Sequence, residues 1–201
     1  EDSAGVIGVV RDLINDTKTT VFESPFTEWL VTWVNPDSIE LSTKPSYQAD
    51  GFSYRLDPET TRYFKSLPEE QGLLTLPSPD DARVLTSSAD DNCVRVTIYD
   101  RTTGTNLPLA IETFADKCVW DSDAILIYCA VPNSLAYGNQ YPDTWYQGLE
   151  SYADSLWVIN ANTGETRVLS DLASEYNESI DVSHINIDEK GEYLYLTDKD
   201  T

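Results

Sequence analysis

Short alternating runs of apolar and polar residues fill most of this chain. The runs are four to seven residues long, and clusters of Asp, Asn, Pro and Gly separate them. A period of two is typical of β-strands, because successive side chains of a strand point to opposite faces of its sheet. Only two short stretches, Pro58–Ser66 and Leu169–Tyr176, could hold a helix. The pattern therefore predicts an all-β protein.

The predicted strands form two kinds of hairpin that alternate along the chain. Hairpins of the first kind have a tight turn rich in Asp, and they occupy Trp29–Ser42, Leu73–Ser87, Lys117–Ala130 and Val182–Thr197. Hairpins of the second kind have an Asp- or Asn-centred turn, and they occupy Gly5–Phe22, Gly51–Leu67, Val94–Ile111 and Leu156–Leu169. Asp and Asn suit such turns because their side chains accept hydrogen bonds from nearby backbone amides.

Four strands per repeat of about 40–50 residues are typical of β-propeller blades, which bury their faces against neighbouring blades. A β-sandwich would also have short strands, but it would not repeat the same turn chemistry at the same phase. We therefore expect one β-propeller domain over residues 1–201 with about four four-stranded blades. The repeats span 29–71, 72–115 and 116–180, and residues 1–28 would share a blade with 181–201.

The order of the two kinds of hairpin along the chain is compatible with two forms of propeller. The sequence starts with a hairpin of the second kind and finishes with one of the first kind, and these halves are complementary. A closed four-bladed ring would combine them, and the whole number of repeats favours it. A portion of a larger propeller is the alternative, which the missing initial Met and the abrupt end at Thr201 favour.

Two segments resemble a known family of repeats. Leu156–Asn160 with Thr163–Thr166 is similar to the blade strand and turn of TolB-type and WD40-like propellers. Ile187–Leu194 resembles the hairpin that opens such repeats, and Ser78–Asp81 keeps part of that motif. Similar propellers precede the catalytic domain of prolyl-oligopeptidase-family peptidases. The resemblance implies a propeller fold, but the repeats depart from the true WD40 pattern, and Gly-His is missing, so no WD40-type partner is implied.

The charge of the chain argues against two classes of binding partner. There are 35 acidic and 13 basic residues, which gives a formal net charge of −22. Nucleic acids and anionic membrane surfaces attract the opposite charge, so neither is expected as a partner. No apolar run approaches the roughly 20 residues of a membrane-spanning helix, so no membrane insertion is expected.

Catalytic motifs are largely absent from the sequence. His184 is the single histidine, and one histidine cannot build a two-histidine metal site. No Gly-x-Ser-x-Gly motif or phosphate-binding glycine loop is present. Paired acids such as Asp80 and Asp81 do not match a spaced calcium-binding loop. We expect no enzymatic activity, no cofactor and no metal.

The third repeat carries an aromatic insertion, Pro132–Ala153. Long loops of repeat proteins often carry the binding surface, and aromatic rings with a polar tip suit protein or carbohydrate ligands. The alternative is that the same rings pack back over the blade as a small satellite core. The candidate binding residues are Tyr137, Tyr141, Trp145, Tyr146 and Tyr152.

Two cysteines and two asparagines are candidates for covalent modification. Cys118 and Cys129 lie on the two arms of one hairpin. This position is compatible with a disulfide in an oxidising compartment and with a pair of adjacent thiols. Asn15 and Asn177 each begin an Asn-x-Ser/Thr triplet, the acceptor for N-glycosylation.

These features favour a non-catalytic scaffold or binding domain that recognises a protein or a glycan. We expect it outside the cytoplasm, at the cell surface, in the periplasm or secreted. One alternative is a propeller that accompanies a hydrolase or peptidase domain encoded elsewhere. Another is a structural subunit that assembles edge to edge into a surface filament or layer.

Overall fold

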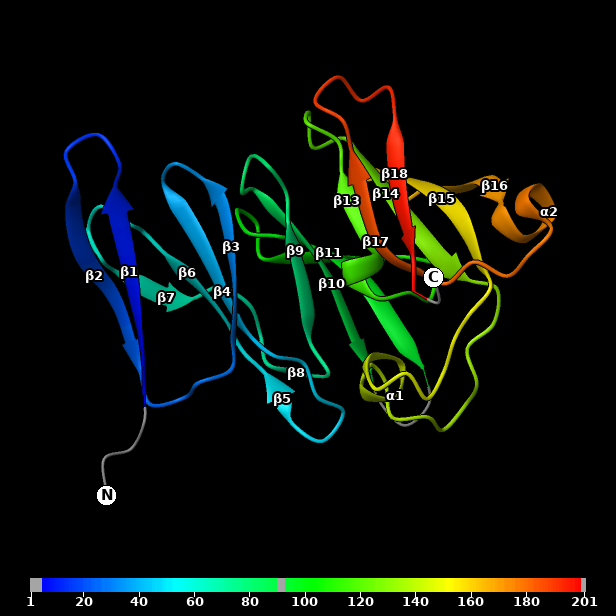
Figure 1. Cartoon of the computed structure of the whole chain (residues 1–201), viewed down its shortest axis with the longest axis horizontal. Coiled ribbons are helices and arrows are strands. Elements are labelled where there is room, and N and C mark those ends of the chain that lie inside the picture. Colours follow the sequence, from blue (N-terminus) through cyan, green and yellow to red (C-terminus); the bar gives the residue numbers. More distant parts are fainter. Residues whose placement is uncertain (1–4, 90–92, 200–201) are drawn as a thin grey trace.

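The chain is built from antiparallel sheets, which confirms the predicted all-β architecture. The computed structural model describes residues 5–89 and 93–199, and most regular elements among them are strands. Three four-stranded sheets, here called blades I, II and III, follow one another along the chain (Figure 1). The N-terminal hairpin packs on blade I, and the C-terminal hairpin packs on blade III.

Within each blade the strands follow chain order from one edge of the sheet to the other. Blade I contains β3 (Trp29–Asn35), β4 (Ser38–Thr43), β6 (Ser53–Leu56) and β7 (Tyr63–Lys65). Blade II contains β9 (Leu74–Pro77), β10 (Arg83–Ala89), β11 (Val94–Asp100) and β12 (Thr105–Pro108). Blade III contains β13 (Cys118–Trp120), β14 (Leu126–Pro132), β15 (Asp154–Asn160) and β16 (Thr166–Asp171). The two-stranded sheets are β1 (Val6–Asp12) with β2 (Thr17–Ser24), β17 (Val182–Ile187) with β18 (Leu194–Asp198), and β5 (Asp50–Gly51) with β8 (Glu70–Gln71).

The terminal hairpins do not share a blade in this structure. Blades I, II and III lie within the expected repeats 29–71, 72–115 and 116–180. Residues 1–28 and 181–201 were expected to form a fourth blade together, but in the described part of the chain β1–β2 and β17–β18 are separate sheets. They are separated because each hairpin packs on a different blade, with blade II between blades I and III (Figure 1).

Helical segments are short. The structure contains η1 (Ala115–Lys117), α1 (Asp143–Tyr146) and α2 (Leu172–Tyr176) among its described residues. The second stretch that could hold a helix contains α2, which Asp171 caps by accepting a hydrogen bond from the Ser174 amide. The first stretch, Pro58–Ser66, instead forms a turn and β7, because pairing with β6 completes blade I. No helix in the described ranges is long and apolar enough to cross a membrane.

Side chains close the turns in a repeating way. In the second hairpin of each full blade, Asp57, Asp100 and Asn160 accept hydrogen bonds from the backbone amides two and three residues further on. Asp12 makes the same bonds in the N-terminal hairpin. Hydrogen bonds to the charged carboxylates lower the pKa of Asp12, chiefly from the Asn15 side chain, of Asp57, chiefly from the Thr60 side chain, and of Asp100, chiefly from the Thr103 amide.

Each blade has two chemically different ends. Because neighbouring strands are antiparallel, the turn after the first strand and the turn after the third lie at the same end of the sheet. We call this the turn end, where the Asp- and Asn-closed turns gather. The connections after the second and fourth strands lie at the opposite, loop end, which carries β5, β8 and α1 (Figure 1).

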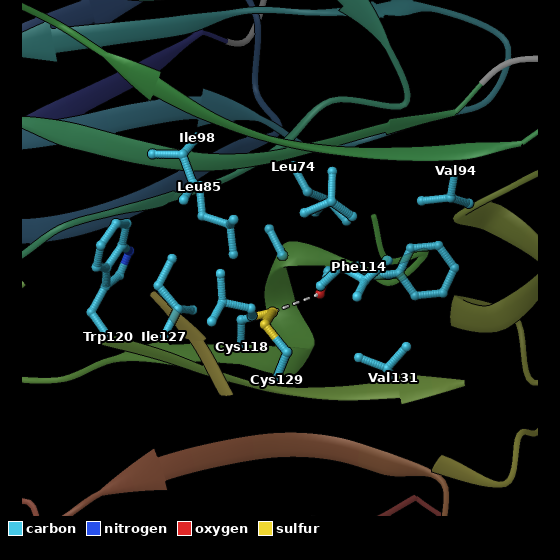
Figure 2. Packing of buried hydrophobic residues seen from close by; sticks show 14 of the residues in the cluster. Leu74, Leu85, Val94, Ile98, Phe114, Cys118, Trp120, Ile127, Cys129 and Val131 are labelled. Atoms are coloured by element: carbon cyan, nitrogen blue, oxygen red, sulfur yellow. Dashed lines mark hydrogen bonds between the residues drawn. A yellow bond between two sulfur atoms is a disulfide. The ribbon is translucent and has the colours of Figure 1, made fainter. Parts of the chain in front are cut away.

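The largest core cluster lies between blades II and III. Leu74 and Leu85 of blade II face Trp120 and Ile127 of blade III, and all four are buried (Figure 2). Phe114 fills the loop end of this core, where the insertion of blade III also packs.

Arginines connect the blades at the turn end. Arg101 of blade II forms ion pairs with Asp81 of its own blade and with buried Glu40 of blade I, the latter at 2.6 Å. Arg83 donates a hydrogen bond to the Ala161 carbonyl oxygen of blade III at 2.9 Å. Burial raises the pKa of Glu40, while the Arg101 charge opposes that change.

Candidate functional site

The aromatic insertion, residues 132–153, lies at the loop end between β14 and β15. Tyr141, Trp145 and Tyr152 are buried in the core between blades II and III. Their rings surround Phe114, with centroid separations of 5.8, 5.3 and 6.4 Å in that order. In this arrangement none of the three can stack on a ligand. They pack back over the blade, as in the alternative, but they join the main core and do not form a separate satellite core.

A buried lysine lies beneath the insertion. Lys117 Nζ is 2.7 Å from Asp181 Oδ1 and 2.8 Å from Asp154 Oδ2, and all three side chains are fully buried. The same ammonium lies 4.9 Å from the ring centroid of Trp145 and 5.1 Å from that of Tyr152. Burial raises the pKa of Asp154, against the opposing charge of Lys117.

Further hydrogen bonds connect this buried cluster to the insertion and to the C-terminal hairpin. Trp145 Nε1 donates to Asp181 Oδ2 at 3.0 Å. Lys199, which follows β18, donates from Nζ to the carbonyl oxygens of Trp145 at 2.7 Å and Glu150 at 3.0 Å. The insertion is therefore held in one position by contacts from blade III and from the C-terminal hairpin.

Two aromatic residues of the insertion remain accessible. Tyr137 is 83% exposed and Tyr146 is 43% exposed. The Tyr146 hydroxyl donates to Asp116 Oδ2, and burial with this nearby carboxylate raises the pKa of the Tyr146 hydroxyl. Of the five residues proposed from the sequence, Tyr137 and Tyr146 are the ones whose rings a ligand can reach.

A cavity lies beside α1. Its volume is about 320 Å³, and Lys44, Ser46, Asp143 and Tyr146 contribute to its lining. Asp143 connects the insertion to the loop after β4, because its carboxylate accepts hydrogen bonds from Ser46 Oγ at 3.2 Å and from the Tyr47 amide at 3.0 Å. The cavity therefore combines an aromatic ring with charged groups of both signs.

A larger groove lies on the other side of the insertion, between blades II and III. Its volume is about 630 Å³, and Arg95, Glu112, Asn133 and Trp157 contribute to its lining. A smaller pocket shares Glu112 with the groove and includes Tyr137. Pockets of this size, with an apolar lining and few polar groups, are where proteins commonly bind small ligands.

The remaining candidates are placed as follows. Cys118 and Cys129 lie opposite each other on β13 and β14 and form a disulfide, within the core between blades II and III (Figure 2). Asn15 is exposed in the turn between β1 and β2, and Asn177 is exposed directly after α2. His184 is exposed on β17.

Among residues 5–89 and 93–199, no group of three or more His, Cys, Asp or Glu side chains could hold a metal ion. The buried cluster of Lys117, Asp154 and Asp181 was not proposed from the sequence. Lys117 and Asp181 are 64 residues apart, so no local motif connects them.

Comparisons with known proteins address the fold. No protein-family model matches the sequence, and no curated protein matches it significantly. Among solved structures, TolB from Acinetobacter baumannii aligns over 92% of this chain and 41% of its own, with 15% identity and a TM-score of 0.60. A TolB-type protein from Agrobacterium tumefaciens aligns over 96% of this chain and 61% of its own, with 12% identity and a TM-score of 0.62.

A third similar structure is the β-propeller domain of the trilobed protease from Pyrococcus furiosus. It aligns over 97% of this chain and 62% of its own, with 13% identity and a TM-score of 0.54. The chain thus spans between 41% and 62% of the length of these three proteins. The three likenesses, together with three consecutive four-stranded antiparallel blades, show that the chain has a TolB-like β-propeller fold.

Proposed function

We propose that this chain is a non-catalytic β-propeller binding domain that recognises a protein or a glycan at its loop end. One observation carries the proposal: the insertion is fixed by the buried Lys117 cluster and forms a wall of both the α1 cavity and the interblade groove. A loop held by buried contacts loses little conformational entropy when a ligand binds, which favours affinity.

The interblade groove has the chemistry of a carbohydrate site. Trp157 contributes an aromatic ring, and Arg95, Glu112 and Asn133 contribute planar polar groups at the same groove. Aromatic rings pack against the apolar faces of ligands, while planar polar groups fix orientation by hydrogen bonds. The net charge of −22 would repel polyanions, so a neutral or cationic ligand is favoured.

A location outside the cytoplasm is part of the proposal. The Cys118–Cys129 disulfide supports it, because such bonds form and persist in oxidising compartments. The fold likeness to TolB proteins is consistent with such a location, although it concerns the fold alone.

The test is binding to glycan and peptide arrays, followed by calorimetry on the strongest ligand found. Tyr137→Ala and Tyr146→Ala should each weaken binding at least about tenfold, the equivalent of about 1.4 kcal/mol. Arg95→Ala should act similarly if the groove holds the ligand. Tyr193→Ala is the matched control, because Tyr193 is exposed near the turn between β17 and β18, away from the insertion.

Two results would contradict the proposal. The first is unchanged affinity in Tyr137→Ala, Tyr146→Ala and Arg95→Ala, with all variants as stable as the parent chain. The second is hydrolytic turnover of a substrate by the purified chain alone, which would show that it is itself an enzyme.

A second candidate function is a propeller that accompanies a hydrolase domain. The likeness to the propeller domain of the trilobed protease favours it, although this likeness concerns the fold. The flanking reading frame tests it: an adjacent hydrolase domain would support this function. Flanking segments with no catalytic domain would favour the binding-domain proposal.

A further inference from the structure

The buried cluster of Lys117, Asp154 and Asp181 contains the reactants of an amide bond. Lys117 Nζ lies 2.7 Å from a carboxylate oxygen of Asp181 and 2.8 Å from one of Asp154, and all three side chains are fully buried. Lys117 directly precedes blade III, whereas Asp181 directly precedes the C-terminal hairpin. An amine and a carboxyl group that folding holds together react far faster than the same groups free in solution, because the entropy of bringing them together is already lost.

One carboxyl oxygen of the cluster has no polar partner. Asp154 Oδ2 accepts a hydrogen bond from the Val182 amide at 2.7 Å and contacts Lys117. Asp154 Oδ1 is buried and has no hydrogen-bond partner in the part of the chain that the structure describes. A buried oxygen without a partner is more costly on a charged carboxylate than on a neutral carboxyl group. Burial accordingly raises the pKa of Asp154, which suits this residue to hold a proton taken from the Lys117 ammonium.

The Asp181 carboxylate, in contrast, is surrounded by donors. Trp145 Nε1 donates to Oδ1 at 3.1 Å and to Oδ2 at 3.0 Å, and Lys199 Nζ lies 3.7 Å from Oδ2. Donors in these positions stabilise the negative charge that develops on the oxygens when a nucleophile adds to the carboxyl carbon. The rings of Trp145 and Tyr152 lie 4.9 and 5.1 Å from Lys117 Nζ and help to exclude water from the same site.

We propose that Lys117 and Asp181 form an intramolecular isopeptide bond in the folded chain, with Asp154 as the acid–base catalyst. Asp154 accepts a proton from the Lys117 ammonium, and the neutral amine adds to the Asp181 carboxyl carbon. The new C–N bond is completed when one carboxyl oxygen leaves as water with two protons from the nitrogen, both relayed by Asp154. One ammonium and one carboxylate become an amide and water, no oxidant or other reagent is consumed, and Asp154 returns to its original state.

The bond would join blade III covalently to the C-terminal hairpin. Lys117 and Asp181 are 64 residues apart, so the cross-link closes a loop that contains all of blade III and its insertion. It restricts the unfolded chain as a disulfide does, but a reductant cannot break it. The ion pair described above is the reactant state of this bond.

The experiment is mass spectrometry of the purified, reduced chain before and after digestion with trypsin. Trypsin cleaves after Lys and Arg, but not after a lysine whose amine has become an amide. The intact mass should be lower than the mass of the sequence by one water molecule. The digest should contain residues 102–167 joined to residues 168–190, since Lys117 lies in the first stretch and Asp181 in the second. Fragmentation of this joined peptide identifies the two bonded residues and excludes loss of water elsewhere in the chain.

Three variants separate the bond from its catalyst. Lys117→Met and Asp181→Ala each remove a reacting group, so neither should contain the joined peptide. Asp154→Asn keeps both reacting groups but cannot relay protons, so the bond should form about a hundredfold more slowly in a time course that starts at cell-free synthesis. Lys65→Met is the matched control, because Lys65 forms an exposed ion pair with Glu69, and it should form the bond as the parent chain does.

The parent chain tests the proposal even where a variant is not folded, which circular dichroism checks. A folded parent chain with the full mass of its sequence and no joined peptide would overturn the proposal and show that the cluster is an ion pair only. A bond from Lys117 to a residue other than Asp181 would overturn the assignment. A folded Asp154→Asn variant that forms the bond as fast as the parent chain would exclude Asp154 as the catalyst.

Discussion

Lys117 and Asp181 form an ion pair at 2.7 Å in which neither side chain is accessible to solvent. Breaking a buried pair by removing one partner leaves an uncompensated charge, which typically costs about 3–5 kcal/mol. We therefore expect Lys117→Met to lower the free energy of unfolding by about that amount, measured by urea denaturation at neutral pH. Lys44→Met is the control, since Lys44 and Glu28 form an exposed pair at 3.6 Å worth about 0–1 kcal/mol.

The loss caused by Lys117→Met should shrink as the pH falls. Burial already raises the pKa of Asp154, and removal of the ammonium would raise it further. A group whose folded pKa exceeds its unfolded value gains stability as the pH falls, because the folded state binds the proton more tightly. An equally large loss at acidic and neutral pH would contradict this explanation.

The turn carboxylates should make the protein less stable in acid. The pKa of Asp57, Asp100 and Asp188 is lowered from the usual 3.8 by hydrogen bonds from nearby backbone amides and, in Asp57, chiefly from the Thr60 side chain. A folded pKa below the unfolded value contributes stability above about pH 4, which is lost as the pH falls through the folded pKa. Thermal melting should therefore decline steeply below about pH 4.

Asn160 supplies a natural control for that decline. It accepts the same amide bonds as Asp100 without a titrating group. Asp57→Asn with Asp100→Asn should keep the turns at neutral pH and make the acid decline shallower. A double variant with the same acid dependence as the parent chain would show that other groups cause it.

Reduction of the disulfide should destabilise the fold. Cys118 and Cys129 are 11 residues apart, and closing a loop of this size restricts the unfolded chain by about 2–3 kcal/mol. Thermal melting with and without a reductant measures the effect. The variant with both residues replaced by Ala should be insensitive to the reductant, and a parent chain that is equally insensitive would contradict the expectation.

Two neighbouring aromatic residues should respond differently to truncation. Trp145→Ala removes a buried ring in contact with Phe114 and Lys117, and it should cost about 3–5 kcal/mol of stability. Tyr146→Ala removes a ring that is 43% exposed, so it should change the melting temperature little. Equal effects of both changes on thermal melting would show that Tyr146 belongs to the core as much as Trp145 does.

The blades could be predicted from the sequence because their determinants are local. Asp57, Asp100 and Asn160 each bind backbone amides two and three residues away, so the turn chemistry is visible in a short window of sequence. Strand alternation is local for the same reason. Whether the two terminal hairpins share a blade could not be predicted in this way, because it depends on contacts between segments at opposite ends of the chain.

The insertion shows where sequence reasoning ends. In the sequence, Tyr137 and Trp145 are both aromatic residues of one long loop. In the structure Tyr137 is exposed and Trp145 is buried. What separates them is the position of Phe114 and Lys117, which precede the insertion in the chain and lie beneath it in the fold. Because the partners are remote in sequence, periodicity could identify the loop as distinctive but could not decide which of its rings face solvent.

The division of every blade into a turn end and a loop end determines where this protein can change. At the turn end, side chains accept hydrogen bonds from the backbone amides of the turn. A longer turn would break these hydrogen bonds and destabilise its blade. At the loop end, segments 44–52 and 132–153 differ in length while the blades that carry them remain alike. Randomised libraries for new ligands should therefore vary residues at the loop end and keep the turn residues constant.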